Sequence, residues 1–174
     1  MKKYFFIAIL LFFTSYVHAF QAVDINPEFQ PTQEELLGLA IEKDFVPADH
    51  GEEYFREKIK EKDTLLAWVG LSQEDKIKIL GALIEIHRQE GTIVERHPVY
   101  YAKEIDKTLY IGLRKGTFRE MGGIGIVFKT IAVMDGDFDN GEDPKVLLES
   151  WMPVEVIEVF KQTYPKKYKR IFGE

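Results

Sequence analysis

Acidic side chains crowd into one short segment in the second half of the chain, and their spacing is suited to metal chemistry. Carboxylate oxygens are the ligands that a hard cation such as calcium prefers. Counted from Asp135, the aspartates fall at positions 1, 3, 5 and 9 of a calcium-binding loop of the EF-hand kind. Asp135, Asp137, Asp139 and Asp143 are therefore the candidate ligands of a metal site, with calcium as its ion.

The same segment departs from a calcium loop at two important positions. Asn140 stands where the sharp-turn glycine belongs, and Val146 stands where a bidentate glutamate supplies two oxygens. We prefer the other interpretation, a solvated acidic loop whose side chains hold turns and helix caps. Asp143 followed by Pro144 fits this alternative, because Asp is a good N-cap and proline suits the first helical turn.

Other residues with catalytic or metal-binding chemistry form no recognisable set. His87 and Glu90 are three residues apart, with His97 shortly after, which would allow a zinc site. A histidine on an apolar helix face is more often a core residue, and we prefer that interpretation of His87. Nucleophile elbows, phosphate-binding glycine loops and HExxH patterns do not occur. The sequence thus favours a non-enzymatic function.

The apolar run from Ile124 to Met134, directly before the acidic segment, must be buried on nearly all sides. We predict a helix from Thr117 to Met134, because Thr117 and Glu120 have the spacing of a capping box. The β-branched content of the run would also suit a buried strand. That alternative gives an α+β fold with a small antiparallel sheet from residues 92–134.

The helix that follows Ser72 and ends at Gly91 is the best defined of the chain. One stripe along it contains Ile77, Leu80, Ile84 and His87. A second apolar stripe on its flank contains Ile79, Leu83 and Ile86. We therefore expect this helix to be buried over a wide arc.

The remaining segments also favour helices. Thr32 and Glu35 have capping-box spacing, and Pro98 suits the first turn of a helix through Lys115, although residues 92–115 would also make three short strands. The prediction is an all-α fold, a single compact domain of about six helices packed around residues 124–134.

The first 19 residues have the pattern of a secretory signal peptide: two lysines, an apolar stretch of about ten residues and a small-residue cleavage site at Val17 and Ala19. Residues 20–174 would then form the single helical domain. The chain has no cysteine, so core packing alone must stabilise it. Removing Lys2 and Lys3 leaves 21 basic and 29 acidic side chains, a net charge of −8.

This charge argues against nucleic acid and anionic membranes as partners and favours a basic protein or cations. We expect a periplasmic or secreted binding protein of the bacterial envelope, without a stable membrane anchor, that acts on a basic partner as an inhibitor or immunity-type protein would. The alternative function is a calcium-binding or calcium-stabilised envelope enzyme or module that uses the acidic loop.

Overall fold

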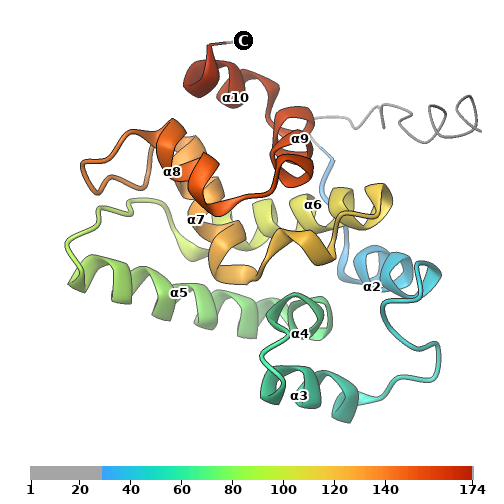
Figure 1. Cartoon of the computed structure of the whole chain (residues 1–174). Coiled ribbons are helices and arrows are strands. Elements are labelled where there is room, and N and C mark those ends of the chain that lie inside the picture. The colour runs from blue at the N-terminus through green and yellow to red at the C-terminus, as the bar shows by residue number, and fades with distance from the viewer. Residues whose placement is uncertain (1–28, 174) are drawn as a thin grey trace, which may run out of the picture.

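The computed structural model describes residues 29–173, and these fold into an all-α structure, as predicted (Figure 1). The predicted signal peptide lies outside the described residues. None of the helices in the described part is long and apolar enough to cross a membrane. The described elements are α2 (Gln33–Glu42), α3 (Glu52–Lys60), α4 (Thr64–Gly70), α5 (Gln73–Gln89), α6 (Pro98–Lys115), the 3-10 helix η1 (Arg119–Met121), α7 (Ile124–Asp135), α8 (Pro144–Trp151), α9 (Val154–Thr163) and α10 (Pro165–Phe172).

The alternative sheet from residues 92–134 is wrong. Residues 98–115 form one continuous helix, α6, and residues 124–135 form another, α7. Between residues 29 and 173, extended pairing is limited to an isolated bridge between Ile93 and Asp139. Pro98 begins α6, which explains why a segment with strand-like composition becomes helical at this point.

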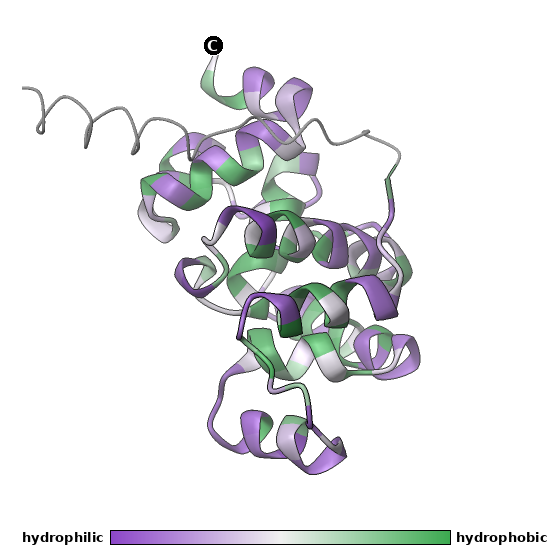
Figure 2. Ribbon diagram, turned by 90° about the vertical axis from the view of Figure 1, so that its right-hand side faces the viewer, coloured by the Kyte–Doolittle hydropathy of each residue, from purple (hydrophilic) through white to green (hydrophobic). Residues whose placement is uncertain are grey.

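Helices α6 and α7 share the centre of the fold (Figure 1). Helix α7 is buried along most of its length, as predicted, and it packs against α4, α6, α8 and α10. Helix α6 contacts α2, α5, α7 and α9. Helices α10 and α3 lie at opposite ends of the molecule, and the apolar segments meet where the helices pack together (Figures 1 and 2).

Most of the predicted helix starts are confirmed. The side chains of Thr32, Ser72 and Asp143 each accept a hydrogen bond from a backbone N–H of the first helical turn. Thr32 and Glu35 form the full capping box. Gly91 follows α5 with a φ of +86°, the left-handed conformation expected of a glycine after a helix end.

The predicted start of the central helix at Thr117 is wrong. Gly116 ends α6 in the left-handed conformation, and Gly122 has a φ of +80°, which a continuous α-helix cannot contain. The Thr117 hydroxyl has no hydrogen-bond partner. Helix α7 instead begins at Ile124, whose N–H donates to Thr64 Oγ1 of α4 at 3.1 Å. Thr64, in another helix, thus caps α7 in place of the local cap that the sequence predicts at Thr117.

Substitution by alanine should have opposite effects on stability at Gly122, which lies at this break, and at Gly81, which lies within α5. Gly122→Ala should lower the free energy of unfolding by more than about 1 kcal/mol, because an added Cβ would meet Ile126 Cδ1 at 2.9 Å in a left-handed backbone. Gly81→Ala should raise it by about 0.5–1 kcal/mol, since Gly81 lies within α5 and no atom within 4 Å opposes a Cβ. Urea denaturation of both variants measures these changes. A stabilised Gly122→Ala variant would contradict the break between η1 and α7.

A buried ion pair links α5 to α6. Lys76 Nζ lies 2.8 Å from Asp106 Oδ1, and both side chains are almost fully buried. Asp106 also accepts from Trp68 Nε1 and Gln73 Nε2, at 2.8 Å each, and Lys76 donates to Gln33 Oε1 at 2.6 Å. Burial lowers the pKa of Lys76, and the Asp106 carboxylate opposes this shift. Because every charge has partners, the network is a structural joint of α2, α4, α5 and α6.

Candidate functional site

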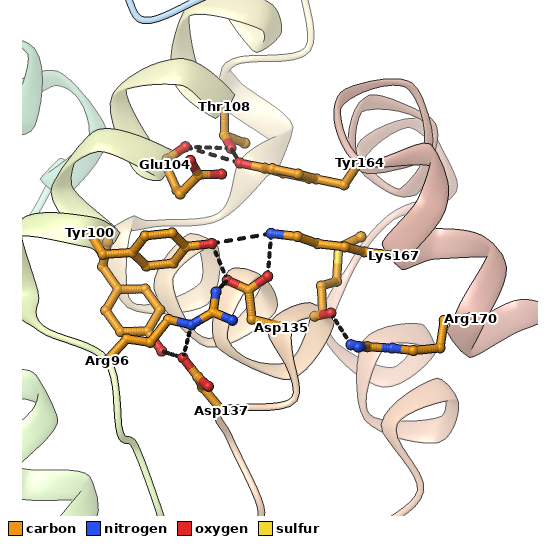
Figure 3. Close-up of polar contacts among 11 residues, drawn as sticks. Arg96, Tyr100, Glu104, Thr108, Asp135, Asp137, Tyr164, Lys167 and Arg170 are labelled. Carbon is orange, nitrogen blue, oxygen red and sulfur yellow. Dashed lines mark hydrogen bonds and ion pairs between the residues drawn. The ribbon is translucent and has the colours of Figure 1, made fainter. Parts of the chain in front are cut away.

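The first two aspartates of the predicted metal site belong to a cluster of ion pairs. The side chain of Asp135 is fully buried, and its carboxylate binds Arg96 Nη1 at 2.7 Å and Lys167 Nζ (Figure 3). The Asp137 carboxylate binds Arg96 Nε at 3.0 Å. Two cations therefore face the two carboxylates, so their charges are balanced within the chain.

Two adjacent tyrosines complete this cluster, which we call the carboxylate clamp and define as Arg96, Tyr100, Tyr101, Asp135, Asp137 and Lys167. The Tyr100 hydroxyl donates to Asp135, and the Tyr101 hydroxyl donates to Asp137 at 2.9 Å. Lys167 Nζ also donates to Tyr100 Oη at 3.2 Å, and Arg96 covers the Tyr100 ring at 4.6 Å. Arg170 donates to the Met134 carbonyl at 2.5 Å beside it (Figure 3).

The clamp joins the start of α6, the end of α7 and helix α10. Burial raises the pKa of both Tyr100 and Tyr101, and their hydrogen bonds to Asp135 and Asp137 raise it further. A tyrosine with a raised pKa stays protonated and is a poor general base near neutral pH. The arrangement is therefore suited to holding three segments together, and not to proton transfer.

The raised tyrosine pKa values predict a loss of stability at alkaline pH. Unfolded tyrosine ionises near pH 10, whereas the folded hydroxyls stay protonated above that value, so the folded state binds more protons there. The contribution of the two tyrosines to the free energy of unfolding is complete below about pH 10 and is lost as the pH rises further. The melting temperature should fall as the pH rises above about 10, and it should fall less steeply in a Tyr100→Phe/Tyr101→Phe variant. Parallel curves for the two proteins would contradict this linkage.

The other two predicted ligands lie apart from the clamp and have local roles. Asp139 is exposed, and its Oδ1 accepts from the Gly141 N–H at 2.9 Å. Asp143 caps α8 through the Lys145 N–H at 2.8 Å. Residues 29–173 contain no group of three or more His, Cys, Asp or Glu side chains placed to hold a metal ion. Calcium binding thus stays a prediction, and calcium would have to displace Arg96 to reach both Asp135 and Asp137.

The histidines considered for zinc have structural environments. His87 is buried, stacks against the Phe128 ring and lies 3.2 Å from Glu90. His97 is the N-cap of α6 and accepts from the Val99 N–H. The preferred interpretation of His87 as a core residue agrees with this position.

Sequence reasoning missed the partners of the carboxylates. Arg96, Tyr100 and Lys167 are far from Asp135 in the sequence, so no local spacing connects them. One signal could have indicated Lys167: the C-terminal segment is strongly basic in an otherwise acidic chain and needs acidic neighbours.

Helix α5 differs from its predicted burial, and the difference exposes an apolar face. Of the predicted stripe, Leu80, Ile84 and His87 are buried, as predicted, and Ile77 is half-buried. The flank is not: Ile79 is 39% exposed and Ile86 is 50% exposed, with the half-buried Leu83 between them. Among the described residues, no element covers this second face.

The exposed face of α5 borders an apolar groove with a volume of about 250 Å³. Helices α3, α4, α5 and α7 form its walls. Its lining residues are Ile59, Thr64, Ala67, Trp68, Leu71, Ile79, Leu83, Ile124 and Gly125. The lining has no acid, base or metal ligand, so this groove is suited to holding apolar side chains and not to catalysis.

Compared with known proteins, the chain matches no family model, no curated protein and no solved structure. The geometry of the groove and of the clamp is therefore the basis for any functional argument.

Proposed function

We propose that this protein is exported to the bacterial envelope and binds another protein there, through the groove between α3, α4, α5 and α7. The partner inserts an apolar helix or strand edge into the groove and carries basic residues beside it. In this role the protein would act as an inhibitor or immunity-type factor does, by covering a surface of its partner.

The single observation that carries this proposal is the uncovered apolar face of α5. Scattered exposed apolar residues are normal on any protein. Here Ile79, Leu83 and Ile86 follow each other at helical spacing on one face, and Ile59 of α3, 52% exposed, lies on the opposite wall of the groove. A contiguous apolar surface of this kind is typical of a protein-binding site.

The charges of α5 favour a basic partner. Four exposed carboxylates lie on or directly after this helix, whereas its exposed cations are Lys78 and Arg88. Lys78 already pairs with Glu74 at 2.7 Å, and Arg88 donates to the Val94 carbonyl at 3.0 Å. The carboxylates are Glu74, Asp75, Glu85 and Glu90. Basic residues on the rim of the partner would therefore speed association and fix its orientation.

Capture from envelope extract with the mature protein as bait tests the proposal, provided that the same capture is repeated with a groove variant. Ile79→Glu places a charge in the groove and should weaken binding of the captured partner at least tenfold, as expected for a central interface residue. Binding should also weaken with salt, because the rim contacts are charged. Titration calorimetry of the purified pair measures both effects.

The matched control is Val154→Glu, because Val154 is 72% exposed on α9, outside the groove. This variant should bind as the wild type does. A partner that binds wild type and Ile79→Glu equally well would contradict the proposed site. Self-association of the wild type that Ile79→Glu abolishes would also contradict it, by showing that a second copy occupies the groove.

A further inference from the structure

Helix α3 forms one wall of the apolar groove, and it is the only helix between residues 29 and 173 that has no buried residue. It packs mainly against α4 and lies at the end of the molecule, joined to the rest by a loop on each side (Figures 1 and 2). Its groove residue, Ile59, is 52% exposed. A helix with so few buried contacts belongs to the least stable part of a fold.

A hydrogen bond and a ring contact attach α3 to its neighbours. The Tyr54 hydroxyl donates to the Phe45 carbonyl at 2.9 Å. The Phe55 ring lies against Gly70, at the end of α4, so closely that a Cβ on Gly70 would come within 2.2 Å of it. In the described chain, the ion pairs of α3 side chains are all local: Arg56 with Glu52, Lys58 with Glu61, and Lys60 with Glu53. No ion pair therefore ties α3 to α4, α5 or α7.

The residues at the two ends of α3 are suited to be hinges. Lys62 follows α3 with a φ of +62°, a left-handed conformation that is unfavourable for a residue with a Cβ and that glycine usually takes. Rotation away from this conformation would relieve its cost. At the other end, Gly51 is exposed, and no atom lies within 4 Å of the position of a Cβ. Val46 before it is buried, so movement would begin in the exposed loop after Val46.

We propose that α3 is a hinged wall of the groove, which swings about Gly51 and Lys62 to admit the apolar segment of the partner and then closes on it through Ile59. The inference rests on the proposed function, since closure needs an occupant in the groove. Closure removes Ile59 from water together with the apolar side chains of the partner, so the partner favours the closed position.

Hydrogen–deuterium exchange of the free mature protein tests the hinge without a partner. Helix α3 has nine residues, and a helix of this length is unstable once it leaves its neighbours, so opening exposes its amides together. We expect the amides of α3 to share one protection factor, at least about a hundredfold below those of α6 and α7. Protection equal to that of α6 and α7, or protection that falls gradually from the middle of α3 to its ends, would overturn the hinge.

Two variants should shift the opening of α3, and a third is the matched control. Gly70→Ala pushes the Phe55 ring away from α4 and should speed exchange in α3 about tenfold or more. Tyr54→Phe removes the hydrogen bond to the Phe45 carbonyl and should speed it about fivefold. Gly38→Ala lies in α2, where no atom opposes a Cβ, and should leave exchange in α3 unchanged. Exchange in α3 that neither of the first two variants speeds, or that Gly38→Ala changes equally, would overturn the hinge.

The distance between two nitroxide labels tests closure. The chain has no cysteine, so labels attach only at introduced ones, Glu57→Cys on α3 and Ala82→Cys on α5, both at exposed positions. Pulsed electron paramagnetic resonance should give a narrower distribution of label distances in the complex with the captured partner than in the free protein. An unchanged distribution in a complex that Ile79→Glu weakens would overturn closure and leave the proposed function standing. If no partner is captured, the proposed function and closure fail together, and the exchange of the free protein still decides the hinge.

Discussion

Lys76→Met should lower the free energy of unfolding by about 3–5 kcal/mol, the largest effect that we expect of a single substitution in this protein. The change leaves the Asp106 carboxylate buried with two neutral donors, Trp68 and Gln73, and without its counter-charge. A buried charge without a partner carries its full desolvation cost. Urea denaturation followed by far-ultraviolet circular dichroism measures the change.

Two controls separate burial from charge. Lys78→Met removes an exposed lysine two residues further along α5, and it should change stability by less than about 0.5 kcal/mol. Lys76→Met/Asp106→Leu removes both charges and should recover part of the loss, because no unpaired charge is then buried, although the Trp68 and Gln73 donors lose their acceptor. Similar destabilisation by Lys76→Met and Lys78→Met would contradict the buried joint.

Asp135→Ala should lower the free energy of unfolding by about 2–3 kcal/mol. The substitution removes the one side chain that binds Arg96, Tyr100 and Lys167 together. It leaves Lys167 without its carboxylate, Arg96 with Asp137 alone, and the half-buried Tyr100 hydroxyl without its acceptor. Thermal and urea denaturation measure the loss, and limited proteolysis should show α10 cleaved earlier than in the wild type.

Asp139→Ala is the matched control, since Asp139 belongs to the same acidic segment but is exposed. It should cost less than about 1 kcal/mol, the value of one hydrogen bond to the Gly141 N–H. If calcium stabilised the fold through this loop, Asp135→Ala, Asp137→Ala and Asp139→Ala would all abolish a calcium-dependent rise in melting temperature. If Asp135 instead stabilises the protein through the carboxylate clamp, Asp135→Ala is less stable than the wild type even when a chelator has removed calcium.

Local sequence signals predicted the fold well where the structure depends on neighbours in the chain. Ser72 and Asp143 cap helices because their side chains reach an N–H two or three residues ahead, a distance that spacing alone reveals. The same rule failed at Thr117, where Gly116 and Gly122 take left-handed conformations that separate two helices. Thr117 and Glu120 have the spacing of a capping box, but the conformations of the two glycines prevent a continuous helix from starting at Thr117.

The candidate sites were harder to predict because they depend on contacts between distant segments. The acidic residues were visible, but Arg96 and Lys167 become their partners only after α6, α7 and α10 have packed together. The two apolar stripes of α5 were also visible. Which of them is covered depends on where α6 packs against α5, and no periodicity in α5 contains that information.

The most direct test of the account is a hydrogen–deuterium exchange comparison of the free protein with its complex, once the captured partner is purified. We expect binding to slow exchange in α3, α4, α5 and the first turn of α7, which form the groove, and to leave α9 and α10 unchanged. Protection confined to α9 and α10, with none in α5, would contradict the claim that the uncovered apolar face is the binding site.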